Sequence, residues 1–223
     1  VVSNLEQKFR DWKPSDSLPM LGVQKNDSAS KLRVERRKTE QAHVSIGLPS
    51  IDINHPQRYA LTLMNVILGE GMSSRLFLEL RENRGLVYDI HSSVSYFRDC
   101  GSLVTYCGVE PKNCPQAIEV ILDQLALLKE GVPENELNKA KELSKGRLLL
   151  RMEDSRSVAM WMGGQEMLTG HVRTIDDIVK KIESVTTEDI KNIAQEVIRE
   201  EELRLAVVGP YRAETQFRKL LDR

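Results

Sequence analysis

The sequence lacks any long hydrophobic run. No apolar stretch approaches the ~18 residues that a membrane-spanning helix needs. The first residues, VVSNLEQKFRDWK, also lack the basic start and apolar core of a signal peptide. We therefore expect a cytoplasmic protein of bacterial type that has no membrane partner.

An excess of charge of either sign is also missing. The 32 Lys and Arg residues and 33 Asp and Glu residues leave a formal net charge of −1, and the two signs are interleaved. Nucleic-acid binding needs clustered basic residues that neutralise phosphates, so nucleic acid is not an expected partner. The strongest basic run, residues 31–38, contains Glu35, which favours a solvent-exposed strand edge.

Cysteines are few and odd in number. Cys100, Cys107 and Cys114 cannot all pair, which argues against a disulfide framework. Zinc sites usually place two ligands two to four residues apart, and these cysteines are spaced more widely. We expect free, mostly buried thiols in a reducing compartment.

The common hydrolase and nucleotide-binding motifs are missing as well. His43, His55, His91 and His171 occur in neither H-E-x-x-H nor H-x-x-E-H, and there is no G-x-S-x-G elbow or Walker loop. Each histidine is expected at a surface position on a strand or loop. The sequence therefore predicts no catalytic residue and no metal ligand within this chain.

Hydrophobic periodicity predicts an α+β fold. Ala42, Val44, Ile46 and Leu48 alternate with other residues, as in a half-buried strand. Further strands are expected over 86–97, 102–109 and 203–208. Helices are expected over 59–68, 115–129, 133–150, 155–168, 175–183 and 188–198, and another is expected to begin at residue 73 or 74. Such an order predicts a mixed or antiparallel sheet layered with helices.

Two regions differ in composition. Residues 1–30 combine a short helical segment, 5–12, with a stretch rich in Pro, Ser, Gly and Asp, which is typical of a linker. The compact domain is expected over residues 31–223. Within it, helix 155–168 and its approach carry a cluster expected to pack in a core or an interface: Met152, Met160, Trp161, Met162 and Met167.

Arg81 and Tyr88 are the two residues whose side chains suggest chemistry. Arg81 follows Phe77 by one helical turn at the edge of an apolar stripe, and Tyr88 lies at the start of a strand after the turn at Gly85. A guanidinium can bind a carbonyl or carboxylate, and a phenol can donate to a developing oxyanion. The alternative is a salt bridge from Arg81 to Glu79 or Glu82 and a core tyrosine.

The segment GEGMSSRLFLELRENRGLVYDI, residues 69–90, resembles the signature of the second half of pitrilysin/insulinase-type zinc metallopeptidases. The likeness is strongest to their mitochondrial-processing-peptidase branch. It extends over about residues 40–210 through QAHVSIGLPS, GVPENELNKAKELSKGRLLL and LAVVGP. The resemblance implies a processing-peptidase type domain whose Arg81 and Tyr88 bind the substrate backbone and help to stabilise the tetrahedral intermediate.

The resemblance also implies what this chain is missing. Family members carry zinc on an inverted H-x-x-E-H motif in a homologous first half, and residues 1–30 resemble the end of that half and its linker. The expected function is that of a substrate-binding C-terminal domain of a zinc endopeptidase. Its expected partners are a peptide substrate and a zinc-bearing half or homologous subunit, with a homo-oligomer as a further option. The alternative is a non-catalytic scaffold or regulatory subunit of a processing-peptidase-like complex.

Overall fold

The fold is described from a computed structural model, which covers residues 1–13, 15, 20–24 and 30–221. Part of the expected linker therefore lies outside the described residues. The elements, in order, are α1 (Val2–Lys8), β1 (Leu32–Arg36), β2 (Ala42–Ser50), α2 (Arg58–Gly69), the π-helix η1 (Phe77–Asn83), β3 (Val87–Tyr96), β4 (Gly101–Val109), the 3-10 turn η2 (Pro111–Asn113), α3 (Cys114–Leu128), α4 (Glu134–Arg151), α5 (Ser155–Thr169), α6 (Ile175–Glu183), α7 (Thr187–Val197), the 3-10 turn η3 (Glu200–Glu202), β5 (Arg204–Gly209) and α8 (Thr215–Leu221).

The strands of the described chain form one mixed sheet in the order β1-β5-β2-β4-β3. β1 pairs in parallel with β5, and the remaining pairs are antiparallel. The expected α+β fold with a mixed sheet is thus confirmed. β1 lies at one edge, which confirms the expected strand edge in the basic run, and β3 lies at the other.

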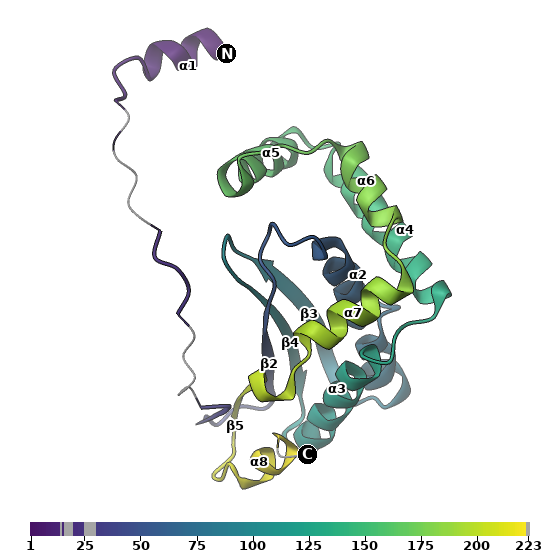
Figure 1. The fold of residues 1–223 in the computed structure, drawn as a ribbon. Coiled ribbons are helices and arrows are strands. Elements are labelled where there is room, and N and C mark those ends of the chain that lie inside the picture. The colour runs from purple at the N-terminus through teal and green to yellow at the C-terminus, as the bar shows by residue number, and fades with distance from the viewer. Residues whose placement is uncertain (14, 16–19, 25–29, 222–223) are drawn as a thin grey trace.

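Helices cover one face of the sheet. In Figure 1, α2, α3 and α7 lie against this face, while no helix of the described chain lies against the other. The alternation predicted for β2 places Ala42, Val44, Ile46 and Leu48 in the core beneath these helices. Their burial, together with that of the apolar stripes of the helices, supplies the hydrophobic driving force for folding.

Local sequence signals set the ends of several helices. Thr174 and Thr186 each begin a helix in a capping box, with Asp177 and Asp189 bonding back to the threonine. At Gly131 the chain has a φ of 113°, a region that glycine enters without steric penalty. For α7 the sequence offers Thr186 or Thr187 as the cap, and in the structure the cap is Thr186.

The helical arm α4–α6 departs from the expectation of a methionine-rich core. No residue of α5 is buried, and its side chains Met160, Met162 and Met167 are exposed. In Figure 1, α5 stands apart from the sheet at the end of this arm. The core alternative for these methionines was therefore wrong, although Trp161 of the same helix packs against the core. The alternative of packing in an interface stays a prediction.

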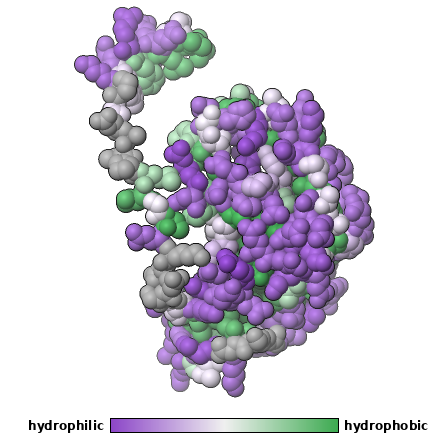
Figure 2. All heavy atoms as spheres, in the orientation of Figure 1, coloured by the Kyte–Doolittle hydropathy of each residue, from purple (hydrophilic) through white to green (hydrophobic). Residues whose placement is uncertain are grey.

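The two terminal helices behave in opposite ways. α1 has no buried residue, and Figure 2 shows apolar side chains along one side of it. α8 was not expected from the sequence, yet it buries Phe217 and Leu220. No helix among the described residues is long and apolar enough to cross a membrane.

Candidate functional site

The site is built where η1 turns into the edge strand β3. Leu80 is fully buried and anchors η1 to the core. The N–H of Leu86 donates to the carbonyl oxygen of Leu80 at 2.7 Å, and Gly85 between them has a φ of +59°. The expected helix end at Gly85 is confirmed, whereas the segment before it is π-helical instead of α-helical. π-Helical turns are rare and occur frequently at functional sites.

A β-bulge then sets the position of Tyr88. Val87 pairs with Val109 and Asp89 with Gly108, so Tyr88 is the extra residue of β3. Val87 and Ile90 are both buried, although strict alternation would place them on opposite faces. The bulge leaves the side chain of Tyr88 76% exposed at the start of the edge strand.

The structure brings Arg81 and Tyr88 together. The guanidinium carbon of Arg81 lies 5.4 Å from the centroid of the Tyr88 ring and 5.0 Å from that of Phe77. Both distances allow a cation–π interaction, which holds the guanidinium between two aromatic rings. Arg81 is exposed and does not point into the interior, contrary to the direction expected from its helical stripe.

The alternative of a structural arginine and a core tyrosine does not fit this geometry. Glu79 bonds with Asn83 at 3.1 Å and with Arg84 at 3.4 Å. Among the described residues, no carboxylate forms an ion pair with Arg81. The N–H groups of Arg81 are therefore available to a ligand, and the phenol of Tyr88 is close by.

A shallow groove of about 380 Å³ begins at Tyr88. Gln41, Leu86 and Gly108 also line it. It is open to solvent and adjoins the edge strand β3, whose outer side has no partner strand in the described chain. An extended peptide could therefore reach Tyr88 along this edge.

A second group of side chains lies on the face of the sheet that no helix covers. Nδ1 of His43 lies 2.8 Å from Oη of Tyr106, and the ring of His91 lies 5.2 Å from the Tyr106 ring. Nδ1 of His91 is 3.7 Å from Oδ2 of Asp89. The sequence placed both histidines on the surface but gave no signal of this cluster, because it is assembled by the register of three strands.

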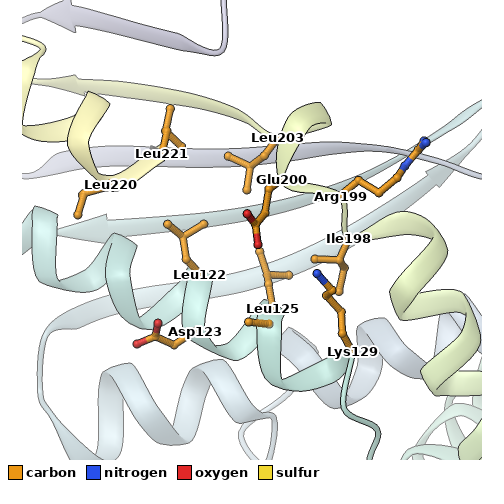
Figure 3. A pocket seen from close by; sticks show the side chains of 11 residues that line it. Leu122, Asp123, Leu125, Lys129, Ile198, Arg199, Glu200, Leu203, Leu220 and Leu221 are labelled. Carbon is orange, nitrogen blue, oxygen red and sulfur yellow. The ribbon is translucent and has the colours of Figure 1, made fainter. Parts of the chain in front are cut away.

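A hollow beneath α8 is lined mainly by apolar side chains (Figure 3). It has a volume of about 220 Å³ and lies between α3, α8 and the segment that leads into β5. Leu122, Leu125 and Leu203 face into it, whereas the Arg199 side chain extends away from them. None of its lining residues belongs to η1 or β3, so it is separate from Arg81 and Tyr88.

The chemistry of the described residues does not fit a zinc centre. Groups of three or more His, Cys, Asp or Glu side chains placed to hold a metal ion do not occur in the described part of the chain. Cys100, Cys107 and Cys114 are free thiols, as expected, and the last two are buried. Arg81 and Tyr88 offer hydrogen-bond donors that suit a carbonyl oxygen, but they do not make up the ligand set of a metal centre.

Comparison with known proteins identifies the family. A family model described as the peptidase M16 inactive domain matches residues 1–144. This chain belongs to the peptidase M16 family. The expected relationship to zinc metallopeptidases is confirmed.

Curated relatives of this M16 domain are named as proteases. It is 35% identical over 193 residues to the uncharacterized zinc protease SCO5738 of Streptomyces coelicolor, covering 86% of this chain and 42% of the relative. It is 34% identical to the uncharacterized zinc protease YmxG of Bacillus subtilis, covering 85% and 46%. The beta subunit of the mitochondrial-processing peptidase of Pongo abelii is 23% identical over 202 residues, covering 86% and 41%. The chain thus spans less than half the length of these relatives.

A solved structure supports the fold of the M16 domain. The crystal structure of a protease from Helicobacter pylori superposes with a TM-score of 0.83 at 21% identity. The likeness covers 94% of this chain and 51% of that protease. At this identity the comparison establishes the fold alone.

Proposed function

We propose that this M16 domain binds the peptide substrate of a zinc endopeptidase and lacks the zinc site itself. The observation that supports the proposal is the exposed Arg81 guanidinium, held beside the Tyr88 phenol without a carboxylate partner among the described residues. Two unengaged donors at the start of an edge strand suit the carbonyl groups of an extended peptide.

Each residue has a separate role in this proposal. Arg81 donates hydrogen bonds to a backbone carbonyl of the peptide and fixes its register along the β3 edge. Tyr88 donates to the oxygen of the scissile carbonyl as negative charge develops on it, which favours the transition state over the bound substrate. The π-helical turn and the bulge place the backbone of both residues, and the cation–π contacts orient the Arg81 guanidinium, which lowers the conformational entropy lost on binding.

The zinc-bearing partner belongs to the proposal as well. A zinc ion held elsewhere would supply the Lewis acid for hydrolysis. Its ligands are proposed in a homologous half that precedes this domain or in a separate subunit, because the described residues offer no such set. Residues 1–30 are proposed as the end of that half and its linker, and residues 31–223 as the substrate-binding domain.

The test uses the complete peptidase, with its zinc-bearing part present. We expect Tyr88→Phe to lower kcat by about 10²-fold, the scale for loss of one oxyanion donor. Arg81→Ala is expected to raise KM and lower kcat/KM, because the peptide loses an anchor in both the ground state and the transition state. Zinc content, measured by atomic absorption, should not change in either variant.

Arg84→Ala provides a matched control. Arg84 lies in the same turn, but it pairs with Glu79 instead of facing the tyrosine. We expect its turnover to stay near that of the unmodified protein. Normal turnover in both Arg81→Ala and Tyr88→Phe would reject the proposed role and favour a scaffold domain.

A further inference from the structure

The face of the sheet that no helix covers carries many small side chains, together with Val104 and Val208. Ser45 and Gly47 on β2, Ser93 on β3 and Ala206 on β5 lie on this face, because they alternate with the buried residues of their strands. On this background, three planar rings stand side by side on three adjacent strands: His43 on β2, Tyr106 on β4 and His91 on β3.

The strand register fixes the arrangement of the rings. Tyr106 stands directly opposite His91 and Ser45, and His43 is its diagonal neighbour on β2. The His43 and Tyr106 rings are 23° from parallel with centroids 6.1 Å apart, and the His91 and Tyr106 rings are 37° from parallel at 5.2 Å. The three rings therefore form one cluster on the sheet, called here the platform, in which His91 is tilted further from Tyr106 than His43 is.

Hydrogen bonding holds the platform in place. In the tautomer that carries its hydrogen on Nε2, His43 accepts the phenol hydrogen of Tyr106 at Nδ1, with 2.8 Å between the heavy atoms. Burial, with a smaller effect of the Asp89 carboxylate, raises the pKa of Tyr106, so the phenol keeps its hydrogen at neutral pH. Asp89 also lies beside His91 and limits the orientations of that ring.

The platform adjoins the groove at Tyr88. Gly108 lines the groove and pairs with His43 on one side and with Asp89 on the other. A Cβ atom on Gly108 would lie 4.0 Å from Oη of Tyr106, so the phenol lies next to a residue that lines the groove. A peptide that reaches Tyr88 can therefore place a neighbouring side chain over the three rings.

We propose that His43, Tyr106 and His91 form a specificity subsite for a planar aromatic side chain of the peptide substrate. The inference rests on the proposed function, because Arg81 and Tyr88 would hold the backbone of the same peptide. An aromatic ring stacks on fixed rings with about 0.5–1.5 kcal/mol beyond the burial of its area. An aliphatic side chain gains only the burial, and the small residues around the platform offer it no deep pocket.

The experiment measures peptide binding to the 223-residue chain. The probes are capped alanine–glycine peptides that are identical except for a central Phe or a central Leu, titrated while the histidine ring resonances are followed by NMR. We expect the Phe peptide to bind about 2-fold to 10-fold more tightly, which corresponds to the stacking energy above. The resonances of His43 and His91 should shift more with the Phe peptide.

Three variants separate stacking from hydrogen bonding. His91→Ala and Tyr106→Ala remove a ring from the platform and should abolish the preference for Phe. Tyr106→Phe keeps the ring but removes the hydroxyl that orients His43, so a reduced preference should remain. Ser95→Ala is the matched control, since Ser95 lies on the same face of β3 but opposes Ser102, away from the rings. Circular dichroism confirms that each variant is folded.

The outcomes distinguish the two proposals. Two results overturn the subsite: equal binding of the two peptides, or a preference for Phe that survives both alanine variants. If Arg81→Ala still weakens both peptides, only the subsite is rejected and the backbone site stands. If neither peptide binds, or if Arg81→Ala weakens neither, the backbone site fails and the subsite fails with it.

Discussion

Gly69 packs so closely against Ser92 that a Cβ atom on the glycine would lie 2.6 Å from the Ser92 backbone nitrogen. The contact joins the end of α2 to the middle of β3, the strand that carries Tyr88. Nearby, the hydroxyl of Ser92 donates to the carbonyl oxygen of Asn65 at 3.3 Å. The position of the candidate site therefore depends on a glycine outside it.

Gly69→Ala is expected to destabilise the domain by about 1–3 kcal/mol, because the new methyl group meets backbone that cannot move freely. Urea denaturation measures the change. Gly47→Ala is the control, since a Cβ atom there has no other atom within 4 Å. Equal stability of the two variants would contradict the close packing of α2 on β3.

Gly85→Ala should cost about 1–2 kcal/mol, because alanine is strained at a φ of +59°. Gly85→Asn should cost less, since asparagine tolerates this conformation. The same order is expected for peptide affinity, because the turn at Gly85 connects the segment of Arg81 to that of Tyr88. Denaturation and peptide titration of both variants test whether backbone strain is the cause.

Arg81→Ala and Tyr88→Phe should leave the free energy of unfolding within about 0.5 kcal/mol of its original value, as is usual for exposed positions. Both side chains lie at the surface, so they contribute little buried area. Urea denaturation, run on the same samples as the binding assays, measures this. A large loss of stability would mean that the pair holds the fold, and reduced binding could not then be assigned to lost contacts.

The cysteines should differ in reactivity. Burial raises the pKa of Cys107 to about 12 and that of Cys114 to about 11, so both remain thiols at pH 8, at which the alkylation is run. Burial and the Asp99 carboxylate also raise the pKa of Cys100, but this residue is partly exposed. Iodoacetamide should therefore modify Cys100 first, with Cys107 and Cys114 reacting only after unfolding. Peptide mass spectrometry gives the order.

The capping box of α6 predicts a dependence of stability on pH. Two hydrogen bonds lower the pKa of Asp177. The larger effect comes from the Thr174 side chain and the smaller from the Thr174 backbone N–H. A carboxyl whose pKa is lower in the folded state stabilises the fold above its unfolded pKa of about 3.9, and this contribution disappears as the pH falls through the folded value. Asp177→Asn should therefore flatten the fall in thermal midpoint below about pH 4. Asp176→Asn, in the same turn but outside the box, is the control.

Periodicity and helix signals made much of the fold predictable. The alternation in 42–48 indicated the buried face of β2, and a threonine cap at 186 or 187 indicated the start of α7. These signals are local, because they depend on side-chain direction and on the hydrogen bonds of a single turn. α8 has an equally local pattern but was missed, and its burial depends on a surface that α3 supplies.

The candidate site was predictable in part. The sequence indicated Arg81 and Tyr88 as residue types suited to bind a carbonyl and an oxyanion, and the motif around them resembled a peptidase signature. It did not indicate the π-helical turn or the bulge at Tyr88, because both depend on how η1 and β3 pack against the rest of the domain. The exposure of Arg81 and Tyr88 was likewise decided by that packing.

The sequence by itself determined the α+β class, the membership of the motif in a peptidase family and the identity of the two candidate residues. The tertiary structure decided which side chains meet. Rings on β2, β3 and β4 lie far apart in the sequence, and only strand register brings His43, Tyr106 and His91 together. Register is set by the burial of the opposite face of each strand, which is a property of the whole core and not of any one segment.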